Sequence, residues 1–179
     1  MTEDIPISDA GMRPAASVQT YRRLITGLDE NGQSHIVEDA TSPHAHVIAD
    51  TDTFVYTDLW RSQSTPVDNS GPADDGLGTP GGIAPPVSGT VFRVVEFPPD
   101  AWWDKNDGTR ERMYHSTPSL DYAIVLTGEI YAVLDTEERV LHAGDVLIQR
   151  GTAHAWSNKS EAPSTVAFVL IGGTAEPQH

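Results

Sequence analysis

The stretch from His115 to Asn158 limits the possible folds of this chain more than any other part of it. Its apolar segments are short and rich in β-branched and aromatic residues, and turn residues separate them at Thr127-Gly128, Asp135–Glu138 and Arg150-Gly151. Segments of this kind favour antiparallel strands joined by hairpin turns. We therefore predict an all-β fold, in which strand ends that lie far apart in the sequence come together in space.

Two sets of residues in this stretch follow regular spacings. The first set is His115, Thr117, Asp121 and Gly128, and the second is Gly144, Gln149 or Arg150, Gly151, His154 and Asn158. Together they resemble the two metal-binding motifs of the cupins, which are small β-barrels. The resemblance covers residues 90–172, and it implies a cupin-type antiparallel β-barrel (jelly roll) with extra N-terminal strands.

The chain departs from the family's first motif at two positions, since Thr117 stands in place of a His and Asp121 in place of a Glu. The resemblance implies metal ligands at His115, Asp121 and His154. Two imidazoles and a carboxylate suit a divalent ion such as Fe, Mn, Ni, Co or Zn, and three protein ligands leave positions open for water and substrate. Thr117 is a poor ligand, but its hydroxyl can bond a metal-bound water. The alternative is a barrel without metal, with the two histidines merely polar residues at its mouth.

Composition sets the broad class of the protein. With 179 residues, we expect one barrel domain at 18–172, with the motifs at 90–172, a flexible arm at 1–17 and a tail at 173–179. The chain has no cysteine, no apolar run of membrane-spanning length and no secretory signal, which predicts a cytoplasmic protein. Its net charge of −15 disfavours nucleic acid and anionic membranes as partners. We therefore expect a small-molecule substrate.

The remaining strands are predicted from short apolar segments between turn residues. They are Tyr21–Thr26, Ser34–Glu38, Phe54–Trp60, Thr90–Phe97 and Thr165–Ile171. The segment at 101–114 is predicted to be a loop. The segment at 61–89 is long and poor in apolar residues, and we expect it to cover the cavity opening.

A second group of histidines precedes these motifs. His44, His46 and Asp50 repeat the His-x-His-acid spacing, but no Gly follows at the expected distance and no second motif completes the set. We interpret this segment as a surface or edge strand. The alternative is that His44 or His46 completes the metal site or reaches a neighbouring subunit.

Three residues are candidates for catalysis or substrate binding: Gln149, Arg93 and Thr117. Gln149 lies two residues after Leu147, so the two share one face of a strand and the amide of Gln149 is expected in the cavity wall. Strand alternation requires that either Arg93 or Glu96 points inward. An inward Arg93 would anchor a substrate carboxylate. The alternative is an Arg–Glu pair across strands on the outer face.

The resemblance leaves the reaction open, because one fold supports many activities. The first hypothesis is a metal-dependent enzyme of lyase or isomerase type that acts on a small oxygenated organic acid or carbonyl compound. The second is a non-heme Fe(II) dioxygenase, since two His and one carboxylate also suit that chemistry. The third is a non-catalytic ligand-binding cupin. The resemblance further implies a homodimer.

Overall fold

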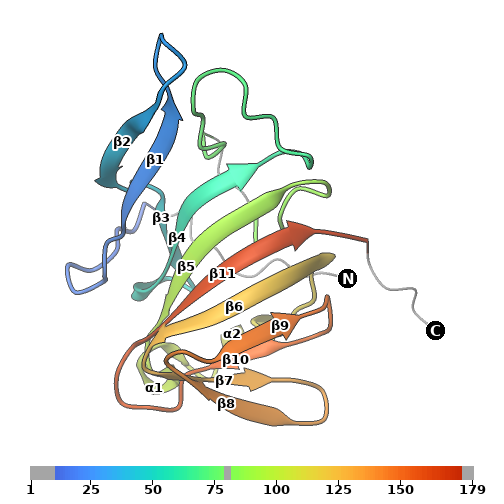
Figure 1. The fold of residues 1–179 in the computed structure, drawn as a ribbon. Helices are drawn as coiled ribbons and strands as arrows, with labels where there is room; N and C mark the ends of the chain where they lie inside the picture. Colours follow the sequence, from blue (N-terminus) through green and yellow to red (C-terminus); the bar gives the residue numbers. More distant parts are fainter. Residues whose placement is uncertain (1–10, 79–81, 175–179) are drawn as a thin grey trace.

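Two β-sheets face each other across the interior of the protein (Figure 1). The computed structural model describes residues 11–78 and 82–174. Within them the larger sheet has the order β3-β4-β5-β11-β6-β9 and the smaller sheet the order β10-β7-β8, and β1 and β2 form a separate hairpin. All of these strand pairs are antiparallel, so the predicted β-barrel with extra N-terminal strands is confirmed.

The strand bounds follow the predicted segments closely. They are β1 (Arg22–Leu28), β2 (Ser34–Thr41), β3 (Ala45–Ile48), β4 (Thr51–Ser62), β5 (Thr90–Phe97), β6 (Ser119–Thr127), β7 (Glu129–Val133), β8 (Glu138–His142), β9 (Val146–Gln149), β10 (Ala155–Ser157) and β11 (Ser164–Gly172).

β11 lies in the middle of the larger sheet, between β5 and β6. Successive side chains of a strand point to opposite faces, so Val166, Phe168 and Leu170 all point into the barrel and are buried. Ile130 of β7 meets this cluster from the smaller sheet and is fully buried. Burying a side chain of this size contributes roughly 2 kcal/mol to stability. The two sheets are therefore held together by a shared apolar core.

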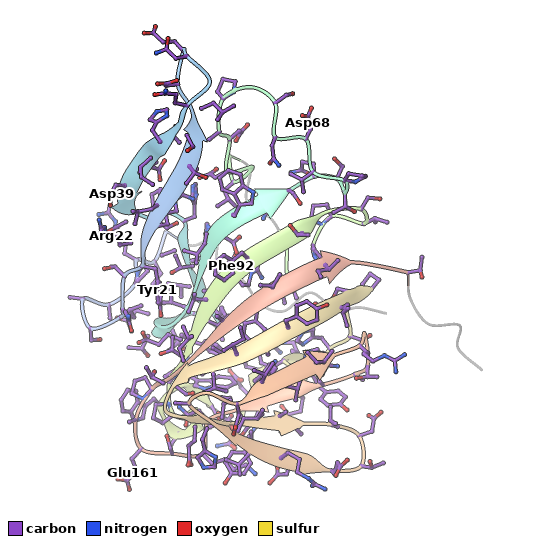
Figure 2. The ribbon with its side chains drawn as sticks, in the orientation of Figure 1. Tyr21, Arg22, Asp39, Asp68, Phe92 and Glu161 are labelled. Atoms are coloured by element: carbon purple, nitrogen blue, oxygen red, sulfur yellow. The ribbon has the colours of Figure 1, made fainter. Side chains whose placement is uncertain are left out.

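The outer face of the larger sheet is only partly covered. Near one end, the backbone N–H of Gln19 donates to Glu96 Oε2 at 3.0 Å. Burial and the nearby Glu96 raise the pKa of Tyr21 to about 12. Six apolar side chains on this face are between 38% and 56% exposed: Phe92, Tyr122, Ile124, Leu126, Val146 and Ile148. Figure 2 labels the first of these on β5.

The β1–β2 hairpin stands beside the edge of the larger sheet (Figure 1). Arg23 connects it to the rest of the protein, because its guanidinium donates to Asp75 Oδ2 at 2.7 Å and to the carbonyl of Leu59 at 2.8 Å. Arg22 and Asp39 form an exposed ion pair across the hairpin at 2.6 Å (Figure 2). That pair lies within the hairpin and, being exposed, contributes little, whereas Arg23 contacts residues outside the hairpin.

The segment at 101–114 differs from the prediction. It contains two single-turn helices, α1 (Asp100–Trp103) and α2 (Thr109–Arg112). Pro99 occupies the N-cap of α1, and Gly108 precedes α2 with a φ of 84°. One helical turn is too short to show a periodic apolar pattern, which is why the sequence indicated a loop. Within residues 11–78 and 82–174, no helix is both long and apolar enough to cross a membrane.

Candidate functional site

A cavity of about 90 Å³ lies between the two sheets. The apolar and aromatic residues that line it are Ile48, Phe54, Tyr56, Ile83, Val95, Phe97, Met113, Trp156, Phe168 and Leu170. Five polar residues complete the wall: Arg93, His115, Thr117, Asp121 and His154. A mainly apolar cavity with a few convergent polar groups is the usual form of a small-molecule site.

The backbone brings the two histidines of the motifs together. The N–H of His115 donates to the carbonyl of His154 at 2.9 Å, and the N–H of His154 donates to the carbonyl of His115 at 2.8 Å. Residues that exchange both hydrogen bonds in this way lie directly opposite each other on antiparallel strands. Their rings are accordingly neighbours, with centroids 4.5 Å apart. Residues 39 positions apart in the sequence thus form one pair.

A backbone carbonyl orients each ring. Nδ1 of His115 lies 2.9 Å from the carbonyl of Met113, and Nδ1 of His154 lies 2.9 Å from that of Thr152. A carbonyl oxygen only accepts, so Nδ1 carries the proton and Nε2 keeps its lone pair in both rings. Burial lowers the pKa of both, and that of His154 falls to about 4 with a further contribution from His115. The site therefore presents two neutral imidazoles.

A row of hydrogen-bonded side chains leads along one face of the chain into β6. Thr117, Ser119 and Asp121 occupy alternate positions, which point the same way on an extended strand. The hydroxyls of Thr117 and Ser119 are 2.7 Å apart, and Ser119 also bonds the carboxyl of Asp121. Sequence reasoning missed Ser119. Its alternate spacing between two candidate residues is the signal that points to it.

Asp121 is a buried carboxyl that can accept a further hydrogen bond or a proton. Burial raises its pKa to about 6, although the hydrogen bond from Ser119 and the charge of Arg93 act in the opposite direction. Its Oδ1 has no hydrogen-bond partner among the described residues. A carboxyl with a pKa near neutrality exchanges a proton readily at physiological pH.

Arg93 points into the barrel, as one of the two alternatives predicted. Its Nε lies 2.9 Å from Asp58 Oδ1 and its Nη2 3.3 Å from Asp58 Oδ2, and Nη2 also donates to the carbonyl of Gly82 at 3.3 Å. The guanidinium stacks on the ring of Tyr56, with Cζ 4.6 Å from the centroid. The alternative pair with Glu96 is wrong, because Glu96 lies on the opposite face. Arg93 is therefore an arginine that already has a carboxylate partner.

Gln149 is buried directly opposite Asp121 in the β9–β6 register, so its inward direction agrees with the prediction. Its amide, however, is not part of the cavity wall. Nε2 donates to the carbonyl of Thr152 at 2.9 Å and to the hydroxyl of the same residue at 2.5 Å. The same carbonyl orients His154, so Gln149 holds a residue that positions the His154 ring and does not itself contact the cavity.

Two further residues of the second motif have structural roles. Gly151 has a φ of 68°, and a Cβ there would lie 3.1 Å from the carbonyl of Thr117, so glycine permits the two motif loops to approach. Asn158 is almost fully buried, and its Nδ2 donates to the carbonyls of Phe97 and Ala162, each at 2.8 Å. It thereby joins the end of β5 to the turn before β11.

The earlier histidines lie outside the cavity wall. His44 Nε2 is 3.1 Å from Asp75 Oδ2, and the His46 ring stacks on Tyr56 at a centroid distance of 4.9 Å. Both belong to the region of β3, the edge strand of the larger sheet, which confirms the edge-strand interpretation. Of the long segment at 61–89, Ile83 lines the cavity and Leu77 is buried.

The side-chain types in the cavity suit a divalent metal ion, but they are too far apart to surround one as they stand. Two neutral imidazoles with free Nε2 atoms, each held through Nδ1 by a carbonyl, match the way proteins present metal-binding histidines. Asp121 Oδ1, which no described residue hydrogen-bonds, is a further oxygen that could ligate an ion. Yet within residues 11–78 and 82–174 no three His, Asp or Glu side chains are grouped closely enough to hold one ion. Asp121 as the third ligand stays a prediction.

Comparisons with known proteins agree on the type of domain. The family model described as Cupin domain matches residues 94–171. The Phomopsin biosynthesis cluster protein C' of Diaporthe leptostromiformis is 36% identical over 169 residues, which are 89% of this chain and 82% of that protein. The cupin-domain-containing oxidoreductase srdD of Neurospora crassa is 30% identical over 165 residues, which are 88% and 78% of the two chains.

Two further similarities extend this picture. The cupin-domain-containing oxidoreductase fogC of Aspergillus ruber is 30% identical over 164 residues, which are 88% of this chain and 75% of that protein. Among solved structures, the Cnp3 cupin domain of Schizosaccharomyces pombe is similar with a TM-score of 0.45 and 11% identity, over 84% of this chain and 87% of that one. The sequence similarity to the fungal proteins therefore reaches well beyond the segment that the family model matches.

Proposed function

Because this chain belongs to the cupin-domain proteins, we propose that it is an enzyme that moves a proton on a small carbonyl compound or oxygenated organic acid. The reaction is of isomerase or lyase type: enolisation, loss of water or loss of carbon dioxide. One observation carries the proposal. Two neutral imidazoles and a carboxyl, one oxygen of which has no partner in the described part of the chain, line the same mainly apolar cavity.

Asp121 is the proton carrier in this proposal. Its carboxylate takes a proton from the carbon next to the substrate carbonyl, and the C–H electron pair becomes a C=C bond as the carbonyl becomes an enolate. Asp121 then returns the proton to another carbon, which completes an isomerisation, or to a departing hydroxyl, which completes a dehydration. A pKa of about 6 suits a group that must both accept and release a proton near neutral pH.

The neighbouring residues orient this carrier and shield it from water. Ser119 bonds the carboxyl of Asp121, and Thr117 bonds Ser119 at 2.7 Å, so the row restricts the carboxyl to few orientations. The apolar wall excludes water, which strengthens each electrostatic interaction within the cavity. His115 and His154 line the same cavity, and their Nε2 lone pairs are available to a metal ion.

A divalent metal ion (Fe, Mn, Ni, Co or Zn) is the cofactor that we propose, with His115 and His154 as its ligands. When bound, such an ion would polarise the substrate carbonyl as a Lewis acid. Asp121 either completes the ligand set or acts as the proton carrier alone. Metal content separates these roles, because Asp121→Asn would lower it in the first case and leave it unchanged in the second.

A second candidate is an oxidoreductase. The relatives from Neurospora crassa and Aspergillus ruber are named oxidoreductases. This favours oxidation of the carbonyl compound or organic acid proposed above. Two His and one carboxylate also suit non-heme iron chemistry. Oxygen dependence separates the two candidates, since proton transfer proceeds under anaerobic conditions and oxygenation does not.

The test is proton exchange, because it does not require knowledge of the natural substrate. The metal-loaded protein is incubated in D₂O with acetone, cyclohexanone, acetophenone or pyruvate, and loss of the α-proton signal is followed by NMR. We expect exchange faster than in buffer with at least one compound, and a rate lowered by roughly a hundredfold or more in Asp121→Asn. Asp68→Asn, an exposed carboxyl in the long loop, is the matched control and should keep the wild-type rate.

No exchange with any of these compounds would contradict the proposal. Substrate consumption that needs oxygen and occurs without exchange would favour the oxidoreductase instead. Ligand binding without any turnover would identify a non-catalytic binding protein.

A further inference from the structure

We propose that the cavity takes an uncharged aryl carbonyl compound, and that Asp58 determines this preference by holding the guanidinium of Arg93. This inference rests on the proposed function, which it narrows from carbonyl compounds and organic acids to the first class. Asp58 is itself outside the cavity wall. It acts through Arg93, and is therefore a positioning residue.

The first step concerns the charge that a ligand meets. Arg93 is the cationic side chain among the residues that line the cavity, and it is the natural partner for a substrate carboxylate. Two of its three nitrogens, Nε and Nη2, already contact the carboxylate of Asp58 at 2.9 and 3.3 Å. Asp58 is nearly fully buried, and its Oδ2 also lies 3.5 Å from Nη2 of Arg61. The cation at the wall is thus compensated by a buried anion.

The second step concerns the cost of binding an anion. In the metal-free protein, a carboxylate ligand would lose its water shell on entering the apolar cavity, and only a new ion pair with a side chain could offset that loss. To provide that pair, Arg93 would have to give up Asp58, which would then keep only its 3.5 Å contact with Arg61, or share one guanidinium between two carboxylates. The carboxyl of Asp121 lines the same cavity and adds no attraction for an anion. A neutral carbonyl compound meets none of these costs.

The third step concerns the apolar part of the ligand. Phe54, Phe97, Trp156 and Phe168 line the cavity from four different strands, and Tyr56 lies under the Arg93 guanidinium. Their rings already contact one another edge to face or tilted, with centroids 5.3 Å apart for Trp156 and Phe168 and 5.4 Å for Phe54 and Phe97. A flat ring inserted among them gains the same contacts. The ligand is therefore small and aromatic as well as uncharged.

The test uses three probes that share nearly the same size. Acetophenone is the neutral aryl ketone, benzoate is its anionic counterpart, and cyclohexyl methyl ketone is its non-aromatic counterpart. Binding to the wild-type protein is measured by ligand-observed NMR titration into the millimolar range, with EDTA present so that a metal ion does not hold the carboxylate of benzoate. We expect acetophenone to bind at least roughly tenfold more tightly than benzoate, and more tightly than the cyclohexyl ketone.

Variants then assign the preference to Asp58. Asp58→Asn releases Arg93, and we expect benzoate affinity to rise by roughly tenfold or more relative to acetophenone. The double variant Asp58→Asn/Arg93→Gln removes both charges and should restore the wild-type order. Asp68→Asn removes one exposed negative charge and controls for net charge. If Asp58→Asn does not fold, Arg93→Gln alone still decides, because it should leave the weak benzoate binding of the wild type unchanged.

Benzoate binding equal to or tighter than that of acetophenone would overturn the inference, as would benzoate binding that Arg93→Gln abolishes. No acetophenone binding in the millimolar range would overturn it as well. The outcome is separable from that of the proposed function. Exchange with pyruvate but with no neutral ketone keeps the function and refutes this inference. Acetophenone binding without proton exchange keeps this inference and contradicts the proposed function.

Discussion

Replacing Asp121 by Asn should stabilise the metal-free protein at neutral pH, even though it removes a candidate catalytic group. Burial in the apolar cavity raises the pKa of this carboxyl from 3.8 to about 6, so ionisation is harder in the folded than in the unfolded chain. A folded-state pKa above the unfolded value gives a contribution that is fully present below pH 3.8 and is lost as pH rises through about 6. At neutral pH the wild-type protein therefore carries the cost of a buried charge.

The magnitude follows from the shift. A change from 3.8 to about 6 is about two pKa units, and each unit corresponds to about 1.4 kcal/mol, so the full cost is about 3 kcal/mol. Roughly 2 kcal/mol of this develops between pH 4.5 and 7.5. The asparagine side chain loses some hydrogen bonding in the same place, but that loss does not depend on pH. The pH-dependent part of the difference between variant and wild type isolates the carboxyl.

The assay is urea unfolding followed by tryptophan fluorescence, with EDTA present, at several pH values from about 4.5 to about 7.5. We expect the stability of Asp121→Asn relative to wild type to increase by roughly 2 kcal/mol across this range. The control Asp68→Asn should show no such increase, because hydrogen bonds from Ser70 lower the pKa of that exposed carboxyl. A difference for Asp121→Asn that stays constant with pH would refute the reasoning.

The other predictions concern the metal, the second motif and the assembly. His154→Ala and His115→Ala should each lower the divalent metal that co-purifies with the protein, as measured by mass spectrometry, while far-UV circular dichroism stays unchanged; full metal content in both would exclude them as ligands. Asn158→Ala should lower the free energy of unfolding by roughly 2–3 kcal/mol, because it leaves the carbonyls of Phe97 and Ala162 without their donor; a loss well below that in urea unfolding would contradict this role. The homodimer stays a prediction. If it forms through the apolar outer face of the larger sheet, Ile148→Glu should yield a monomer by light scattering. A dimer that persists in this variant would place the interface elsewhere.

The sequence predicted best where the physical cause is local. β5 has the bounds that its apolar run predicts, because alternation sustains the strand and Pro98-Pro99 ends it. The direction of Arg93 could not be decided in the same way. Either charge would be costly to bury on the inner face without a partner. Arg93 points inward because Asp58, 35 residues away in the sequence, pairs with it there.

The candidate site shows the same division. His115, Asp121 and His154 line one cavity, and their role as ligands of one metal ion stays a prediction. Alternation also gave the inward direction of Gln149, but not the contact with Thr152 that turns its amide away from the cavity. That contact depends on the conformation of the turn around Gly151, and no periodic pattern in the sequence encodes it.

The wall of the cavity comes from two parts of the chain that the family match separates. The groups proposed for chemistry, among them His115, Asp121 and His154, lie within residues 94–171. Ile48, Phe54, Tyr56, Ile83 and Arg93 all precede that segment, as does Asp58. Mutations in the first half can therefore change the lining of the cavity while His115, Asp121 and His154 stay unaltered. Because Phe54 and Tyr56 are also buried in the core, we expect single substitutions at the cavity wall to be tolerated better than exchange of the whole segment from β3 to the start of β5.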